Sequence, residues 1–131
     1  MIPRSIDIVF NLRFSNELTQ DDIKIKFEEI LSSLDCQYEI IWNCSAEPFI
    51  TNEGKLTKIL QKVIKETIGV NSNLSTTGGT SDARFISKHA KETVEFGPLN
   101  QTAHKVNENI NLKDLDNLEK IYYAALCEIL L

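Results

Sequence analysis

The chain opens with an alternation of apolar and polar residues. From Ser5 to Arg13 every second side chain is apolar, which is the period of a strand with one apolar face. Residues 37–43 are rich in aromatic and β-branched side chains and also have strand composition. Between these segments Thr19 is a predicted N-cap, and apolar residues recur at helical spacing after it: Ile23, Phe27, Ile30, Leu31 and Leu34. The first third therefore predicts strand, helix, strand.

The remainder of the chain is richer in helical pattern. An apolar stripe predicts a helix over Lys55–Ile68, closed by Gly69 as a C-cap. A terminal amphipathic helix is predicted from Leu112 to Leu131, capped by Asn111. Between them we expect a polar, glycine-bearing loop over residues 71–82, a short helix over 84–90 and a short buried strand over 93–96.

These elements indicate an α/β fold: a strand-helix-strand unit followed by a helix-rich segment with one or two short strands. The expected boundary lies in the loop between Asn43 and Glu53. Two strands and one helix make a poor free-standing domain, and little chain precedes the first strand to complete a sheet. We therefore expect that an N-terminal portion is missing, and that the exposed apolar surface favours association with another chain.

Composition narrows the class of protein. The net charge is -5, and the 14 basic residues are spread along the chain, so we expect no nucleic-acid partner. The apolar runs are shorter than a bilayer span and no signal-peptide core begins the chain, so we expect a cytoplasmic protein without a membrane partner. Three widely spaced cysteines match neither a disulfide framework nor a CxxC metal knuckle, and are expected to be reduced thiols, most of them half-buried.

The densest candidate chemistry lies in the polar stretch Thr76–Asp82 and just beyond it. Two glycines there permit close backbone approach to a ligand, and hydroxyl and amide groups supply hydrogen-bond donors. The stretch lacks the lysine and spacing of a P-loop, so nucleotide binding is unsupported, and a plain turn is the alternative. No G-x-S-x-G elbow surrounds Ser81, which argues against a serine nucleophile.

Two further residues have both a functional and an ordinary interpretation. If residues 104–108 were helical, His104 and Glu108 would share a face as a metal site or as a base with its orienting group. The alternative is a solvent-exposed histidine, because a zinc site needs about three protein ligands. Arg13, at the polar end of the first strand, could clamp a carboxylate or could form a surface ion pair. His89, flanked by lysines, is expected to be solvated.

Several motifs, in this order, resemble the C-terminal part of the succinyl-diaminopimelate desuccinylase family. They are I-P near the start, F-N-L-R-F, P-F-I-T, G-K-L, T-G-G-T-S-D-A-R-F-I, V-E-F-G-P-L-N and H-K-V-N-E. The resemblance extends from about Ile2 to the last residue. It departs from the family pattern at Ala83, usually glycine, and at Asn109, usually cysteine.

The resemblance implies a two-zinc amidohydrolase that cleaves N-succinyl-LL-2,6-diaminopimelate into succinate and LL-2,6-diaminopimelate, in lysine and diaminopimelate biosynthesis. It implies that residues 1–47 are the second half of a two-layer lid and dimerisation domain, and that 48–131 are the C-terminal part of the catalytic domain. By the same resemblance His104 is a zinc ligand, and Arg13, Gly79, Thr80 and Asn100 contact the substrate.

The general base and the other zinc ligands of that family have no counterpart in this sequence. The resemblance therefore implies that the chain alone is inactive without an N-terminal portion or complementary chain, and that it contributes a single ligand to a site for two zinc ions. A homo-oligomer is expected from the lid. The alternative is a non-catalytic fragment that self-associates or binds a partner.

Overall fold

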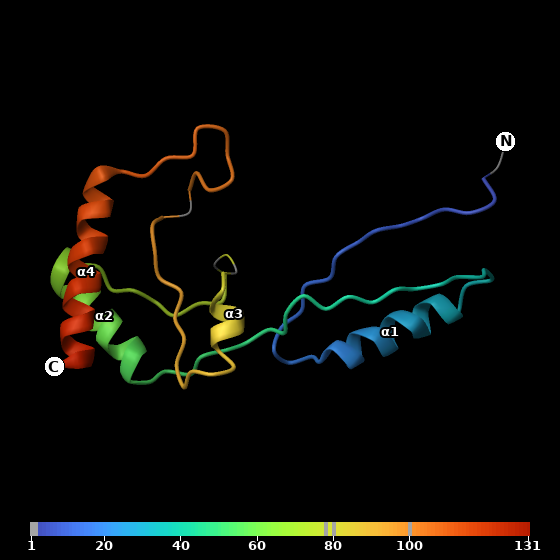
Figure 1. Cartoon of the computed structure of the whole chain (residues 1–131), viewed down its shortest axis with the longest axis horizontal. Helices are drawn as coiled ribbons and strands as arrows, with labels where there is room; N and C mark the ends of the chain where they lie inside the picture. The colour runs from blue at the N-terminus through green and yellow to red at the C-terminus, as the bar shows by residue number, and fades with distance from the viewer. Residues whose placement is uncertain (1–2, 78, 80, 100) are drawn as a thin grey trace. The chain divides into compact units, whose positions relative to one another are not determined.

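The computed structural model describes residues 3–77, 79, 81–99 and 101–131. These residues form four helices: α1 (Gln20–Ser32), α2 (Lys55–Ile68), α3 (Ala83–Ile86) and α4 (Leu112–Leu130) (Figure 1). The chain divides into two units, Met1–Phe49 and Ile50–Leu131. Within the described residues no helix is both long and apolar enough to cross a membrane.

In the first unit, α1 begins where the sequence predicts. The Thr19 hydroxyl accepts from the Asp22 backbone N–H at 3.1 Å, and the Asp22 carboxylate accepts from the Thr19 backbone N–H at 2.9 Å. This reciprocal capping box satisfies two backbone donors that a helix N-terminus leaves without intrahelical partners. Hydrogen bonds from Thr19 lower the pKa of the Asp22 carboxyl, because they stabilise its charged form.

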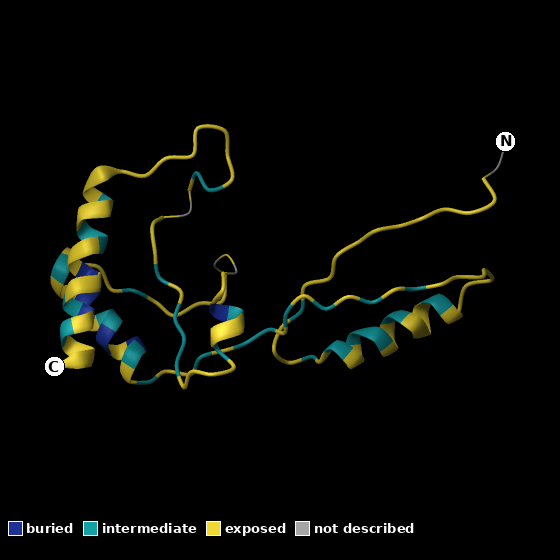
Figure 2. Cartoon of the chain, viewed as in Figure 1, coloured by how far each residue is buried: buried dark blue, intermediate teal, exposed yellow. Residues whose placement is uncertain are grey.

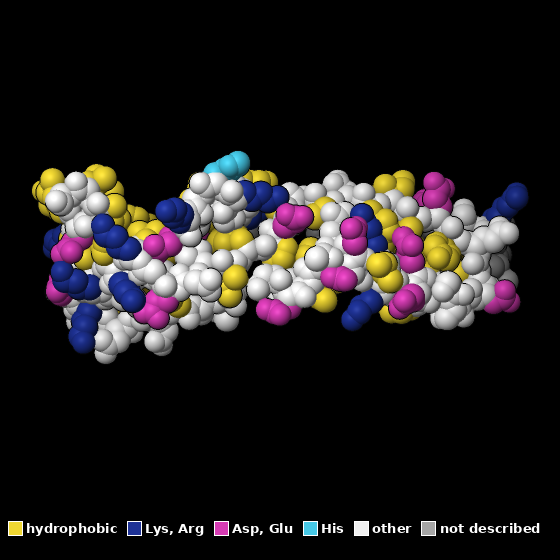
Figure 3. All heavy atoms as spheres, turned by 90° about the horizontal axis from the view of Figure 1, so that it is seen from below, with side chains coloured by type: hydrophobic (Ala, Val, Ile, Leu, Met, Phe, Trp, Pro, Cys, Tyr) yellow, Lys and Arg dark blue, Asp and Glu magenta, His cyan; other side chains and the backbone are white. Residues whose placement is uncertain are grey.

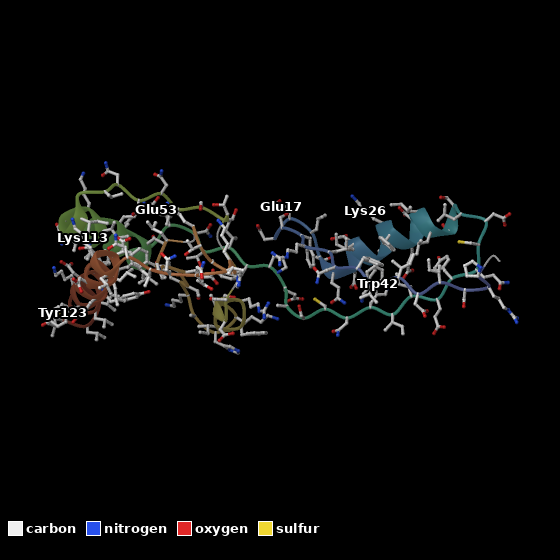
Figure 4. The ribbon with its side chains drawn as sticks, turned by 90° about the horizontal axis from the view of Figure 1, so that it is seen from above. Glu17, Lys26, Trp42, Glu53, Lys113 and Tyr123 are labelled. Carbon is white, nitrogen blue, oxygen red and sulfur yellow. The ribbon has the colours of Figure 1, made fainter. Side chains whose placement is uncertain are left out.

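Three aromatic rings hold extended chain against α1. Phe27 on the helix stacks on Phe10 at 5.0 Å between ring centroids, and meets the edge of Trp42 at 5.6 Å. The Trp42 indole N–H also donates to Glu28 at 3.2 Å. Trp42 is labelled on the segment that follows α1 in Figure 4. The residues predicted to form strands therefore do pack on the predicted helix, as Phe10 and Trp42 show.

The expected strands are the part of the fold that the structure does not contain. No strand is assigned among the described residues, including 5–13, 37–43 and 93–96. A strand is defined by hydrogen bonds to a neighbouring strand. Alternating side chains give a segment one apolar face, but they do not provide the neighbouring strand. Val9 is 98% exposed, and Ile6 and Ile8 of the predicted apolar face are 77% and 71% exposed, so that face is covered only in part.

The core of the second unit lies between α2 and α4. Ile121 is 1% exposed and packs with four other buried residues, Ile59, Val63, Ile64 and Ala125. Figure 2 shows the buried residues concentrated where these two helices face each other. Lys62 of α2 also donates to Glu128 of α4 at 2.7 Å, and this contact raises the pKa of Lys62. The two helices are the framework on which the loops of this unit rest.

The predicted ends of these helices are confirmed within a residue. α2 covers Lys55–Ile68, and Gly69 closes it with φ 73°, a left-handed conformation that glycine adopts without steric cost. α4 begins after Asn111, whose side chain accepts from the Lys113 N–H. The predicted helix over 84–90 is shorter, and ends at Ile86.

Many apolar side chains remain on the surface of both units. Tyr123 is 72% exposed and projects from α4 (Figure 4), and Leu130 is 75% exposed. In Figure 3 apolar side chains reach the surface among acidic and basic ones. All three cysteines are free; Cys44 and Cys127 are half-buried, in line with the expectation for most of them, and Cys36 is exposed.

Candidate functional site

A short segment, Glu92–Phe96, connects the helical core to the candidate loops. Its first residue caps α2: the Glu92 carboxylate accepts from the backbone N–H groups of Lys55 at 3.0 Å and Leu56 at 2.8 Å. A carboxylate at this position satisfies unpaired donors and interacts favourably with the helix dipole. Gly54 makes the approach possible, because a Cβ there would lie 2.5 Å from the Glu92 carboxyl carbon.

Two further contacts fix the same segment. The Thr51 hydroxyl donates to the Thr93 carbonyl at 2.6 Å and accepts from the Thr93 N–H at 3.2 Å. The Tyr122 hydroxyl of α4 donates to the Phe96 carbonyl, and the two rings lie 5.7 Å apart. Phe96 also packs against the core between α2 and α4. Glu92–Phe96 is thus bonded at both ends to the rigid part of the unit, without forming the predicted strand.

The glycine-bearing loop is tied to this segment through Glu95. The Glu95 carboxylate accepts from the Ser81 backbone N–H at 2.9 Å and from the Ser81 hydroxyl at 2.7 Å. The Ser81 hydroxyl in turn accepts from the Ala83 N–H at 3.2 Å, at the start of α3. Gly79 is exposed, and a Cβ there would meet no atom within 4 Å.

Ala83, which stands where the resembling sequences usually have glycine, does not strain the backbone. Positive φ among the described non-glycine residues is recorded at His104 and Asn107, and Ala83 is not one of them. Ala83 begins α3 and is 7% exposed. The position therefore does not require the conformational freedom of glycine.

His104 lies in a turn closed by its own hydrogen bonds. The Thr102 hydroxyl donates to the Asn109 carbonyl at 2.8 Å and accepts from the Asn109 N–H at 3.2 Å, which joins the two ends of the turn. The Lys105 ammonium donates to the Gln101 carbonyl at 2.6 Å. His104 itself is exposed and has φ 62°, in the left-handed region that a non-glycine residue seldom adopts. A backbone in this conformation costs free energy, and such residues concentrate at functional sites.

The condition for His104 and Glu108 to share a helix face is not met, and His104 is exposed, which is the alternative left open by the sequence. Residues 104–108 are not helical, and the Glu108 carboxylate accepts from the His104 backbone N–H at 3.3 Å. Glu108 therefore supports the main chain of His104 and is not shown as a partner of its ring. The side chain that the sequence singles out is thus exposed, on a turn whose shape is set by neighbouring polar groups.

The described residues do not form a metal site by themselves. Across residues 3–77, 79, 81–99 and 101–131, no group of three or more His, Cys, Asp or Glu side chains could hold a metal ion. A zinc ion requires about three protein ligands and two zinc ions require more. Within the described part of the chain, His104 is therefore not a member of a group large enough to hold zinc.

Arg13 belongs to the first unit and is exposed. Thr80 and Asn100, the other two residues expected to contact substrate, lie outside the described residues. Gly79 and His104 belong to the second unit, and both are exposed to solvent.

The structural roles of Glu92 and Glu95 were missed in the sequence, because each acts across a long separation along the chain and neither shows a periodic or capping pattern.

These observations describe an α2–α4 core that carries two polar loops, one with a glycine-bearing sequence and one with an exposed histidine. Residues 3–128 match the family model of peptidase family M20/M25/M40. The chain therefore belongs to this peptidase family.

The relatives are more specific. A protein named succinyl-diaminopimelate desuccinylase from Nitrosomonas europaea is 43% identical over 131 residues, which are 100% of this chain and 35% of the relative. Proteins of the same name from Thioalkalivibrio sulfidiphilus and Nitrosomonas eutropha are each 41% identical, over 99% and 100% of this chain. The chain spans 35% of the length of these relatives.

Proposed function

We propose that this chain forms the C-terminal part of a zinc-dependent succinyl-diaminopimelate desuccinylase. The observation that carries the proposal is the identity of 41% to 43% with proteins of that name over essentially the whole chain. The reaction is hydrolysis of N-succinyl-LL-2,6-diaminopimelate to succinate and LL-2,6-diaminopimelate. Residues 1–47 act as the second half of the lid, through which the protein forms a homo-oligomer, and 48–131 complete the catalytic domain.

In this proposal His104 is one ligand of a two-zinc site whose other ligands lie outside this sequence. Its exposure and its place on a hydrogen-bonded turn support that role, because a ligand to a shared site must reach acidic groups from elsewhere. When bound, zinc supplies a polarising charge and an activated water for amide hydrolysis. This chain supplies the imidazole and no general base for that water.

The remaining proposed contacts recognise an anionic substrate. Arg13 carries a guanidinium suited to a carboxylate, and its exposure leaves the side chain accessible. Gly79, Thr80 and Asn100 offer neutral donors, which suit a succinyl group with a carboxylate and an amide carbonyl. We infer that the isolated chain does not hydrolyse the substrate, because one histidine cannot hold two zinc ions.

Complementation tests the proposal. The chain would be coexpressed with the part of the Nitrosomonas europaea relative that precedes the matched region, and zinc-dependent release of succinate from the succinylated substrate would be measured. We expect release by the mixture and none by either part alone. A folded, associated mixture that releases no succinate would count against the proposal.

A second function is favoured by the exposed apolar residues. Val9, Ile41 and Tyr123 are 98%, 88% and 72% exposed, and surfaces of this kind favour association. The chain would then be a non-catalytic fragment that pairs with itself or with a partner. Sedimentation over a wide concentration range distinguishes this function: a monomer throughout argues against self-association.

A further inference from the structure

We propose that Glu95 is a positioning residue, which holds Ser81 at the C-terminal end of the glycine-bearing loop by accepting from both donors of Ser81. The inference deepens the proposed function, on which its link to substrate rests, because that loop contains two of the residues assigned to the succinyl group. The bonds themselves, from the Ser81 N–H at 2.9 Å and from the Ser81 hydroxyl at 2.7 Å, belong to the isolated chain.

Glu95 is well placed for this task because its own backbone is immobilised. Thr93 is bonded to Thr51 on one side of it, and Phe96 is bonded to Tyr122 on the other. Phe96 also packs on the core of α2 and α4. Glu95 thus links the core to the C-terminal end of the loop and holds that end in place relative to the core.

The loop needs an outside support of this kind. Its sequence, T-G-G-T-S-D, offers small and polar side chains and no large apolar group to bury. A methyl group added at Gly79 would meet no atom within 4 Å, so packing does not restrict this residue. A glycine loses more conformational freedom than any other residue when it is fixed. Two charge-assisted hydrogen bonds at Ser81 offset part of that cost and fix the C-terminal end of the loop.

The same contacts define which donors remain for a ligand. The Ser81 hydroxyl donates to Glu95 and accepts from the Ala83 N–H, and the Ser81 backbone N–H also donates to Glu95. Both Ser81 donors are therefore occupied inside the protein. A carboxylate ligand placed beside them would face the charge of Glu95. An anionic group is consequently disfavoured at Ser81.

Amide hydrogen exchange measured by NMR on the full chain tests the support directly. Glu95→Ala removes the acceptor, and the Ser81 amide should exchange at least about tenfold faster, because a charged acceptor is lost. Glu95→Gln keeps an acceptor oxygen of the same reach and should restore part of the protection. Glu119→Ala, an exposed change on α4, is the matched control. Amides of α2 and α4 report whether the fold is intact.

Equal exchange of the Ser81 amide in the wild type and in Glu95→Ala, with α2 and α4 still protected, overturns the proposal. If Glu95→Ala unfolds the chain, Glu95→Met replaces it, because it keeps the length of the side chain and removes both acceptor oxygens. Unchanged exchange of the Ser81 amide in that variant has the same meaning. The exchange result does not depend on catalysis, so it stands even if the complemented protein is inactive.

The link to substrate is tested in the complemented enzyme. There Glu95→Ala should raise KM for the succinylated substrate about tenfold with a smaller change in kcat, and Glu95→Gln should lie between it and the wild type. A complemented Glu95→Ala enzyme with the KM of the wild type overturns the positioning role. Absence of activity in the wild-type mixture contradicts the proposed function instead, and leaves the exchange measurement to decide on Glu95.

Discussion

Gly54→Ala is expected to destabilise the second unit by displacing the cap of α2. The added Cβ would lie 2.5 Å from the carboxyl carbon and from one oxygen of Glu92, and 2.6 Å from the other oxygen. The end of a glutamate side chain can move away, so the steric overlap itself is relieved cheaply. Moving it, however, breaks the bonds from Lys55 at 3.0 Å and Leu56 at 2.8 Å.

The magnitude follows from those two bonds. Loss of an N-terminal cap costs about 0.5–2 kcal/mol, and replacing glycine by alanine at the N-cap adds a small further cost. We therefore expect Gly54→Ala to lower the free energy of unfolding by about 1–2 kcal/mol. Urea unfolding followed by far-UV circular dichroism measures this as a shift of the midpoint without a change of slope.

A double-mutant cycle with Glu92→Ala isolates the cause. Once the carboxylate is absent, Gly54→Ala has no cap to displace and should cost less than about 0.5 kcal/mol, so the two changes should be strongly non-additive. A Gly54→Ala variant as stable as the wild type would refute the reasoning. So would a cost of the same size in both backgrounds, because it would show that Glu92 is not what the new methyl group displaces.

Three other predictions concern the framework. Ile121→Ala should cost about 2–5 kcal/mol in urea unfolding, because the side chain is 1% exposed, whereas Leu130→Ala, at 75% exposed, should change stability by less than about 0.5 kcal/mol; similar costs for both would contradict the assigned core. Tyr122→Phe should cost about 1 kcal/mol through loss of the bond to the Phe96 carbonyl, and should speed amide exchange in Glu92–Phe96; unchanged exchange there would argue against this contact. The lowered pKa of Asp22 means that its stabilisation of α1 is present above the pKa of the unfolded chain and is lost as pH falls through the folded pKa. Thr19→Val removes the hydroxyl and should raise the pKa of Asp22 in an NMR titration, whereas an equal pKa in both proteins would show that the Thr19 hydroxyl is not a cause.

The helices could be predicted from the sequence because their signals are local. Thr19, Gly69 and Asn111 each mark a helix end by their own side chain or backbone, and the apolar stripes between them need no distant partner. The predicted strands are absent among the described residues, because their signal is not complete within one segment. Residues 5–13 have the required alternation, but a strand also requires a hydrogen-bonded neighbour that a single segment does not specify.

The candidate site shows the same difference between local signals and contacts over a long sequence separation. His104 could be singled out from its residue type and motif, yet its turn depends on Thr102 bonding to Asn109, a pairing with no periodic signal. Glu95 lies within one of the family motifs, but the sequence assigns it no role, since its partner Ser81 is distant in sequence. The assignments of Arg13, Gly79, Thr80 and Asn100 to substrate, and of residues 1–47 to a lid, stay predictions.

The central claim is that His104 is a zinc ligand completed by groups from outside this sequence. Zinc content of the purified complemented protein, measured by atomic emission, tests it most directly. We expect two zinc ions per pair of complementary chains for the wild type and for His89→Ala, and a loss of at least one for His104→Ala, because each zinc site needs about three protein ligands. A complex in which His104→Ala keeps the full zinc content of the wild type would contradict the account.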